Sequence, residues 1–268
     1  MTVSNLPMYD LPELRVATDA WWQGLAAAMR GEGMRDVPEH LSRADDDAAF
    51  WRQGALLLSQ TCGYPLMTEF KDDLKLIGTP HYDVAGGDGP RYCSWIIVRQ
   101  DHPAQVLADL RGEVCALNNI GSHSGMNALR HTLAPLAEGE AFFSQVRLSG
   151  GHRQSIEMVT DGRADVAAID CVTWGLIESV AAHELAGVRI LAETEKVPGL
   201  PYVTTAGADD RVVGKLRSSV MQALDSRGLA DAWQALRISG FSETSLVDYQ
   251  VILDMAQQAV DQGYPELR

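Results

Sequence analysis

The sequence has no excess of basic residues. Its 268 residues include 22 Lys and Arg against 36 Asp and Glu, which gives a formal net charge of −14 and a sequence pI of about 4.8. Nucleic acids and anionic membrane surfaces bind to basic patches, so this balance argues against both as partners. A small anion stays compatible with the acidic chain, because a few backbone N–H groups can hold such a ligand locally.

Cysteine is scarce and unpatterned. The four cysteines, Cys62, Cys93, Cys115 and Cys171, lie far apart and form no CxxC, so no metal or redox motif is indicated and no cofactor is expected. The start, "MTVSNLPMYDLPELRVATDA", shows no basic region followed by an apolar one. No apolar run approaches the roughly 20 residues of a membrane span. We therefore expect no membrane insertion, reduced thiols and a cytoplasmic location, or a periplasmic one if the chain is exported by another route.

Familiar catalytic motifs are also missing. The chain has no G-x-S-x-G elbow, no Walker A lysine motif and no G-x-G-x-x-G, which leaves a serine hydrolase and the use of nucleotide phosphates unsupported. His123 and His131 are eight residues apart, which is no zinc-ligand spacing. We expect no catalytic residue and a protein that is not an enzyme.

Short apolar runs alternate with helical patterns along the chain. The runs "GALLLSQ" (54–60), "YCSWIIVRQ" (92–100) and "DVAAID" (165–170) are typical of buried strands. Segments with helical spacing separate them, and "TVSNLPMY" (2–9) opens the chain as a strand. "DDDAAF" (45–50) is typical of a solvated helix start. From about residue 208 the pattern is helical. The alternation predicts an α/β protein with mainly parallel sheets.

In open α/β sheets, ligands bind outside the carboxyl ends of the strands. Polar, small or aromatic residues follow each predicted strand, which a single generic helix cap would not explain. These candidate ligand-binding residues are Tyr9, Gln60, Thr61, Cys62, Tyr64, Ser122, His123, Ser124, Gly125, His152, Asp170 and Trp174.

The stretch "IGSHSGMNALRHTL" (120–133) is the most informative of these positions. A helix N-terminus offers unsatisfied N–H donors, and Ser and Gly let an oxyanion approach them. The alternative is that Ser122 or Ser124 is an ordinary N-cap. Asp170 has the same two interpretations, a ligand contact or a helix cap. His152 is either a donor to the anion or a surface-loop residue. Tyr9, Tyr64 and Trp174 line a cleft or pack in the core.

Two stretches carry a family resemblance. "LADLRGEVCALNNIGSHSGMNAL" (107–129) and "SGGHRQSIEMVTDGRADVAAIDCVTW" (149–174) resemble the substrate-binding proteins of phosphate/phosphonate ABC transporters, which have the type 2 periplasmic-binding-protein fold. In that family a Ser-Thr-Ser-Gly-like turn holds the phosphonate, and 122–125 stand in its place. A Ser-Gly-x-His element and an Asp closing the next strand correspond to His152 and Asp170. The resemblance is strong over 92–178 and weaker over 50–92.

The resemblance implies two α/β lobes joined by two hinge crossovers, near "GPRYCSW" and "ETEKVPGLP". Lobe 1 would be 1–90 plus 193–268, and lobe 2 would be 91–192. A small oxyanion, phosphate- or phosphonate-like, would bind in the cleft between the lobes and favour their closure. A permease of an ABC transporter or a regulatory protein would be the partner.

The chain departs from the family pattern at His123, which replaces the middle hydroxyl of the turn. Its first residues also show no signal peptide, so two alternatives to a transport role stay open. One is an enzyme recruited from the same fold, as in thiamine-precursor synthases, with Cys62 or His123 reacting with the ligand. The other is a cytoplasmic sensor that responds to its ligand through a protein partner.

Overall fold

The computed structural model describes residues 2–43 and 47–268, which form two compact units. Unit 1 comprises the described residues up to Asp83 together with Asp88–Arg91 and Pro198–Asp248. Unit 2 comprises Val84–Gly87, Tyr92–Val197 and Tyr249–Arg268. The crossings after Arg91 and Val197 lie close to the predicted ones at 90 and 192. The C-terminal segment differs, because we expected it in lobe 1.

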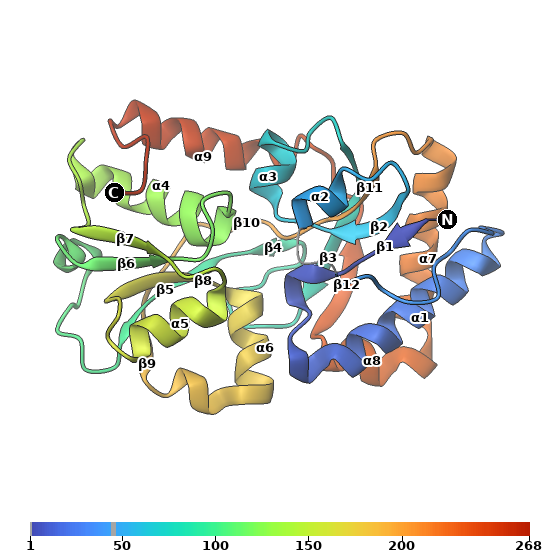
Figure 1. The fold of residues 1–268 in the computed structure, drawn as a ribbon, viewed down its shortest axis with the longest axis horizontal. Helices are drawn as coiled ribbons and strands as arrows, with labels where there is room; N and C mark the ends of the chain where they lie inside the picture. The colour runs from blue at the N-terminus through green and yellow to red at the C-terminus, as the bar shows by residue number, and fades with distance from the viewer. Residues whose placement is uncertain (1, 44–46) are drawn as a thin grey trace. The chain divides into compact units, whose positions relative to one another are not determined.

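Unit 1 is built on a five-stranded sheet in the order β1-β2-β11-β3-β12 (Figure 1). The strands are β1 (Val3–Ser4), β2 (Leu56–Gln60), β11 (Tyr202–Thr205), β3 (Leu74–Tyr82) and β12 (Ile238–Ser242). Only β1 and β2 pair in parallel. The helices are α1 (Arg15–Gly31), α2 (Asp47–Trp51), α3 (Gly63–Thr68), α7 (Asp210–Asp225) and α8 (Ala230–Ala235), with short 3-10 turns η1 (Pro7–Tyr9), η2 (Pro12–Leu14) and η6 (Arg227–Leu229).

The core of unit 1 follows from the apolar spacing of α1 and β2. Every residue of β2 is buried, as expected for a strand covered on both faces. Helix α1 buries Trp21, Trp22 and Leu25 along one stripe. Trp21 also donates a hydrogen bond from Nε1 to the hydroxyl of Tyr202, at 3.1 Å. This bond ties α1 to β11, a strand far away in the sequence.

Unit 2 is built on a five-stranded sheet in the order β7-β6-β8-β5-β9. The strands are β7 (Gln145–Leu148), β6 (Val114–Leu117), β8 (Val166–Asp170), β5 (Ser94–Arg99) and β9 (Val188–Glu193). The first three are parallel, and β5 is antiparallel to both β8 and β9. The carboxyl ends of β6, β7 and β8 therefore lie at one edge of the sheet. The helices are α4 (Ala128–Ala137), α5 (His152–Thr160), α6 (Cys171–Ala181) and α9 (Gln250–Asp261), with the turns η3 (Leu107–Leu110), η4 (His123–Asn127) and η5 (Ala182–Leu185).

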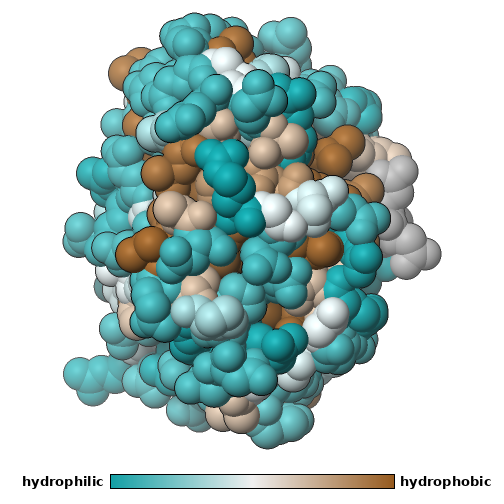
Figure 2. Space-filling view, turned by 90° about the vertical axis from the view of Figure 1, so that its left-hand side faces the viewer, coloured by the Kyte–Doolittle hydropathy of each residue, from teal (hydrophilic) through white to brown (hydrophobic). Residues whose placement is uncertain are grey.

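Figure 2 looks at the side of the molecule that carries β6 and β7. The surface there is mainly hydrophilic, with hydrophobic residues gathered in its upper half. β7 is an edge strand, and its residues Gln145, Arg147 and Leu148 are exposed. Polar and charged side chains on an edge strand discourage pairing with other chains.

The C-terminal segment belongs to unit 2 because α9 packs against α4 (Figure 1). Ala259 and Tyr264 are fully buried in one core with Leu129 and Leu133 of α4. The amide of Asn127 donates to the carbonyl of Ile252, at 3.0 Å. The amphipathic pattern of α9 predicts a helix with one buried face but does not identify the helix that covers it. Our prediction therefore kept α9 in lobe 1 together with the rest of 193–268.

Several local predictions differ from the structure. The sheets are mixed rather than mainly parallel. The predicted opening strand is limited to Val3–Ser4, because Pro7 starts a 3-10 turn. Ile238, expected in a helix, begins β12 instead. A two-stranded ribbon, β4 (Arg91–Tyr92) with β10 (Val197–Pro198), accompanies two of the chain crossings. Positions 45 and 46 of the expected acidic helix start lie outside the described residues.

Among the described residues, no helix is both long enough and apolar enough to cross a membrane.

Candidate functional site

Ser122 opens a helix at the edge where β6 and β7 end. Its hydroxyl accepts a hydrogen bond from the backbone N–H of Gly125, at 3.0 Å, and its carbonyl accepts one from Asn127, at 3.1 Å. The second bond spans five residues, so η4 is a π-type turn that runs on into α4. Ser122 is therefore the N-cap, one of the two roles its sequence allowed. The N-terminus of this long helix places a positive dipole end at the sheet edge.

Four polar side-chain atoms form a closed ring beside this cap. We call them the polar ring: Asn118 Nδ2, Ser122 Oγ, Ser124 Oγ and His152 Nε2. Around the ring the distances are 3.2 Å from Asn118 to Ser122, 3.3 Å from Ser122 to Ser124, 2.9 Å from Ser124 to His152 and 3.3 Å from His152 back to Asn118. The ring joins the end of β6 to the start of α5.

The donors of the polar ring can be assigned from Asn118. Its amide nitrogen only donates, so Ser122 Oγ and His152 Nε2 both accept from it. His152 Nε2 then carries no proton, and the Ser124 hydroxyl donates to it. Ser122, which accepts from Asn118 and Gly125, directs its own hydrogen to Ser124. Both serine hydroxyls are thus engaged inside the ring.

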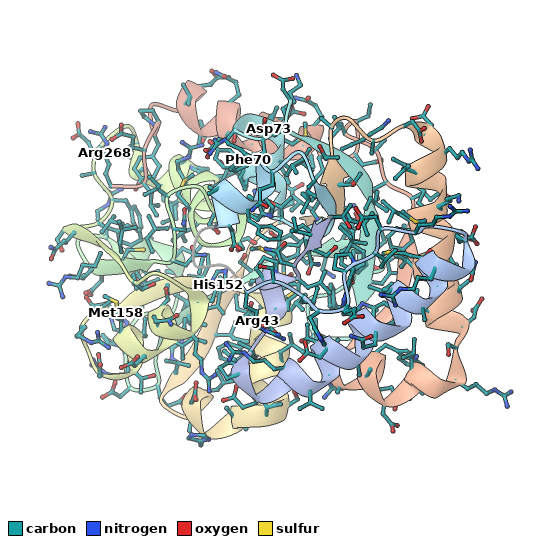
Figure 3. All side chains as sticks on the ribbon, turned by 45° about the vertical axis from the view of Figure 1, so that its right-hand side comes forward. Arg43, Phe70, Asp73, His152, Met158 and Arg268 are labelled. Atoms are coloured by element: carbon teal, nitrogen blue, oxygen red, sulfur yellow. The ribbon has the colours of Figure 1, made fainter. Side chains whose placement is uncertain are left out.

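His152 is the first residue of α5, and Met158 lies further along the same helix (Figure 3). Burial lowers the pKa of His152 to about 4. The imidazole is therefore neutral at pH 7. This agrees with its role in the ring, where Nε2 accepts rather than donates.

Gly125 is required for the ring to close. A Cβ atom built on Gly125 would lie 1.9 Å from Asn118 Oδ1 and 2.7 Å from Asn118 Cγ. Both distances are far inside van der Waals contact, so any side chain at this position displaces the Asn118 amide. The glycine thus permits a close approach of the helix backbone to the end of β6.

The polar ring suits an oxyanion in chemical terms. It offers two hydroxyl donors and an amide donor at the positive end of a helix. None of its four side chains is negatively charged, so nothing in it repels an anion. In the structure the Ser122 hydroxyl donates to Ser124 and the Ser124 hydroxyl donates to His152. A bound oxyanion would accept these two hydrogen bonds instead.

His123 takes part in a different network, although it lies between the two serines. Its Nδ1 faces Asn127 Nδ2 at 3.2 Å, and its ring lies 6.3 Å from that of Tyr92. Asn127 also accepts from the Arg130 guanidinium at 2.8 Å. Burial, with a smaller contribution from His131, lowers the pKa of His123 to about 3. This network connects η4 to the C-terminal segment rather than to the ring.

Asp170 caps α6. Its Oδ1 accepts from the backbone N–H groups of Val172 and Thr173, at 2.7 and 3.0 Å. Asp170 is buried and ends β8, next to β6 in the sheet. Trp174, in the first turn of α6, is partly buried. The helix-cap interpretation of Asp170 thus describes its main contacts.

The candidate residues of unit 1 gather around the end of β2. The Gln60 amide donates to the Tyr82 hydroxyl and to the Leu200 carbonyl, both at 3.0 Å. Tyr9 packs edge-on against Tyr82, with ring centroids 5.0 Å apart. Tyr9, Gln60 and Tyr82 line a small cavity of about 20 Å³. Three of the five candidates, Tyr9, Gln60 and Thr61, are buried.

Thr61, Cys62 and Tyr64 follow β2 directly. Thr61 is fully buried and its hydroxyl has no hydrogen-bond partner among the described residues. Cys62 and Tyr64 are partly exposed, and Cys62 precedes the short helix α3. The strand-end rule therefore places a buried hydroxyl with unused hydrogen-bonding capacity at the end of β2.

Sequence reasoning missed Asn118. Asn118 directly follows β6, where the strand-end rule applies, but the prediction considered only the Ser, His and Gly residues of 122–125 after this strand. Asn118 makes two of the four contacts of the polar ring. Applying the rule to the first residue after each strand would have found it.

One group among the described residues, His102, Glu113 and Asp165, has the composition of a metal site. It lies at the edge of the unit 2 sheet where β6 and β8 begin, away from the polar ring. His102 Nε2 lies 3.5 Å from Glu113 Oε1. However, His102 Nδ1 accepts from the backbone N–H of Ala104, at 3.2 Å, so the proton of the neutral ring sits on Nε2. Burial and the neighbouring Asp165 raise the pKa of Glu113. This group is hydrogen-bonded internally and is not arranged to bind a metal.

Solved structures share the fold of the whole chain. The PhnD1 protein of Prochlorococcus marinus, in complex with methylphosphonate, aligns with a TM-score of 0.75 at 12% identity, covering 97% of this chain and 98% of its own. A binding component of a phosphonate ABC transporter from Pseudomonas aeruginosa gives 0.72 at 15%, with 97% and 87% covered. A Xanthomonas citri protein bound to chloride gives 0.74 at 18%, with 97% and 98% covered. These are two-lobed periplasmic-binding-protein folds. A search of curated proteins gave no match.

The sequence of the chain identifies its family. A family model described as the periplasmic phosphonate substrate-binding protein of ABC transporters matches residues 22–249. The chain belongs to this family. The resemblance found in the sequence is thereby confirmed, as is the expectation that the protein is not an enzyme.

The expected cytoplasmic location is wrong. The family comprises periplasmic proteins, so the protein is assigned to the periplasm. Our expectation rested on the first 20 residues of the chain, whereas residues 22–249 match the family model.

Proposed function

We propose that this protein binds a small phosphonate or a related phosphorus oxyanion as the receptor of an ABC importer. The observation that carries the proposal is the polar ring, which gathers neutral donors at the start of a long helix. Family membership supports the choice of ligand class. The permease of such an importer is the proposed partner.

The proposed anion contacts in unit 2 are the hydroxyls of Ser122 and Ser124 and the turn of His123 and Gly125. His152, whose Nε2 is an acceptor in the ring, is proposed to accept from a protonated oxygen of the ligand. On binding, the two hydroxyls rotate away from each other and from His152 to donate to the ligand oxygens. Asn118 holds Ser122 and His152 in place, and so acts as a positioning residue. Hydrogen bonds to a charged acceptor are stronger than the neutral ones they replace, which favours this exchange.

The other sequence candidates remain proposed ligand contacts. In unit 1 they are Tyr9, Gln60, Thr61, Cys62 and Tyr64, of which Thr61 has an unused buried hydroxyl. In unit 2 they are Asp170 and Trp174 at the start of α6. Because Asp170 carries a negative charge, its proposed role is to accept from a hydroxyl or ammonium group of the ligand and not to contact the anion.

The test is a ligand titration by calorimetry and thermal denaturation. The panel contains methylphosphonate, phosphate, sulfate and adipate. A ligand present at 100 times its dissociation constant stabilises the fold by about 2.7 kcal/mol, which a thermal scan detects. We expect stabilisation by the phosphorus oxyanions alone. Equal stabilisation by sulfate and adipate, or none by any member, would contradict the proposal.

Two variants assign the effect to the ring. Ser124→Ala removes one hydroxyl donor to a charged ligand, worth about 1.5–3 kcal/mol, so its affinity should fall roughly 10- to 100-fold. Ser179→Ala is the matched control, because the Ser179 hydroxyl donates only to the Leu176 carbonyl of its own helix. Unchanged affinity in the Ser124 variant would remove this serine from the site.

A further inference from the structure

Cys93 and Cys171 lie opposite each other at one end of the pairing between β5 and β8. The antiparallel register joins Trp95 to Ile169 and Ser94 to Asp170. One further step along both strands brings Cys93 opposite Cys171. The backbone N–H of Cys171 donates to the carbonyl of Cys93, at 3.1 Å, so the pairing continues through the two cysteines.

The two thiols are in contact and sealed from solvent. Both are free thiols in the structure, and each shifts the pKa of the other: Cys171 lowers the pKa of Cys93, and Cys93 raises that of Cys171. Cys93 is 2% exposed and Cys171 is fully buried. Gly86, at a φ of +88°, lies over the pair, and a Cβ atom built on it would be 2.8 Å from Cys93 Sγ and 3.0 Å from Cys171 Cβ. The backbone here approaches both cysteines so closely that only glycine fits.

This placement meets the geometric requirement of a disulfide. Directly opposed residues in a hydrogen-bonded antiparallel pair have Cα atoms about 5.5 Å apart. Disulfides span Cα separations of about 4.4–6.8 Å. A Cβ atom built on Gly86 would lie 2.8 Å from Cys93 Sγ and 3.0 Å from Cys171 Cβ, so the two side chains are on the same side of the chain. Among the described residues Cys115 and Cys62 have no such neighbour. Cys115, on β6, pairs with Val146 of β7 and Val166 of β8, and Cys62 belongs to unit 1.

We infer that Cys93 and Cys171 form a structural disulfide in the mature protein. The inference rests on the periplasmic location of the family and on this geometry, and not on the identity of the ligand. The bacterial periplasm is oxidising, and thiols placed in contact there become joined. The reduced thiols expected from a cytoplasmic location lose their basis together with that location.

The oxidant in this reaction is a protein disulfide of the periplasm. The Cys93 thiolate attacks one sulfur of that disulfide, which releases the other sulfur as a thiol and leaves a mixed disulfide. The Cys171 thiolate then attacks Cys93 Sγ, forming the Cys93–Cys171 bond and releasing the second oxidant thiol. Two electrons pass to the oxidant, and its two sulfurs take up the two protons.

Because both sulfurs are buried in the folded chain, the oxidant reaches them before folding is complete. The finished bond closes a loop of roughly 80 residues, a length at which cross-linking removes much of the entropy of the unfolded chain. It also ties the first residue of α6 to the start of β5, directly beside Asp170. The disulfide would thus hold one wall of the strand-end edge in unit 2.

The test is peptide mapping of the full-length protein after refolding in a glutathione redox buffer. The chain is unfolded without reductant, alkylated and digested. We expect two alkylated cysteines, Cys62 and Cys115, and one cross-linked peptide that joins Cys93 to Cys171. Four alkylated cysteines, or a link that involves Cys62 or Cys115, would overturn the inference. Since the protein is unfolded for analysis, this result does not depend on ligand binding.

A thermal scan gives a second measurement. Adding a phosphine reductant should lower the Tm of the oxidised protein by roughly 5–10 °C. The same reductant should leave the Tm of Cys93→Ser unchanged, and should still lower that of Cys115→Ser. A Tm that does not respond to reductant in the wild-type protein, once the link has been mapped, would show that the bond has no structural role. Failure of phosphonate to stabilise the protein would bear on the proposed function alone.

Discussion

Replacing Gly125 with alanine should disrupt the polar ring without altering any of its four members. The new Cβ atom would lie 1.9 Å from Asn118 Oδ1. The two atoms must move apart by more than about 1 Å to reach an ordinary contact distance, and the Asn118 side chain is the group that can move. When it does, the hydrogen bonds from its amide to Ser122 and His152 are lost.

The magnitude can be estimated from these two bonds. Each neutral hydrogen bond contributes about 0.5–1.5 kcal/mol, so the ring loses about 1–3 kcal/mol. Alanine in place of glycine inside a helix returns up to about 1 kcal/mol through its helix propensity. The net loss in the free energy of unfolding should therefore be at most about 2 kcal/mol. Ligand affinity receives no such compensation and should fall roughly 10- to 100-fold.

The assay is calorimetric titration with methylphosphonate on Gly125→Ala beside Gly214→Ala. Gly214 lies in α7 of unit 1, and a Cβ atom there meets nothing within 4 Å. This control carries the same chemical change without the clash, so its affinity should equal that of the wild type. If Gly125→Ala also binds like the wild type, Asn118 does not position the site and the role given to the polar ring is wrong.

Two further predictions concern stability. His123 and His152 have pKa values of about 3 and 4, so the unfolded chain binds more protons than the folded one between those values and about 6.5. The stabilisation from the two neutral histidines is present above pH 6.5 and is lost as the pH falls. Each histidine should lower the free energy of unfolding by about 2 kcal/mol between pH 6.5 and 4.5. Urea unfolding of His123→Gln should show a shallower pH dependence than the wild type, and an unchanged one would contradict the assignment. Arg130→Met leaves the buried amide oxygen of Asn127 and the carbonyl of the exposed Pro265 without their donor. The free energy of unfolding should fall by about 1–3 kcal/mol, whereas the exposed Arg147→Met should stay within about 0.5 kcal/mol. Equal effects would show that the link between α4 and the C-terminal segment is not stabilising.

Much of the fold could be predicted from local patterns. The apolar run of β2 and the alternation over residues 92–178 follow from periodicities of two and 3.6 residues, which depend only on neighbours in the chain. The strand-end rule likewise found Ser122, Ser124 and His152, because the end of a strand is visible in the sequence. Where pairing joins distant segments, as in β11 and β12, the same patterns gave no partner and the sheet was predicted as mainly parallel.

The sequence by itself determined which residue types stand at the strand ends, and therefore that the protein offers neutral hydroxyl donors at a helix start. Only the tertiary structure decided which of them meet. It brings Asn118 and His152 together with the serines across two strands, turns His123 toward Asn127, and sets Cys93 opposite Cys171. The meeting of His152 with Asn118 and the serines, and that of Cys93 with Cys171, depend on distances between segments far apart in the chain. Side-chain packing and strand register fix these distances, and local periodicity does not encode them.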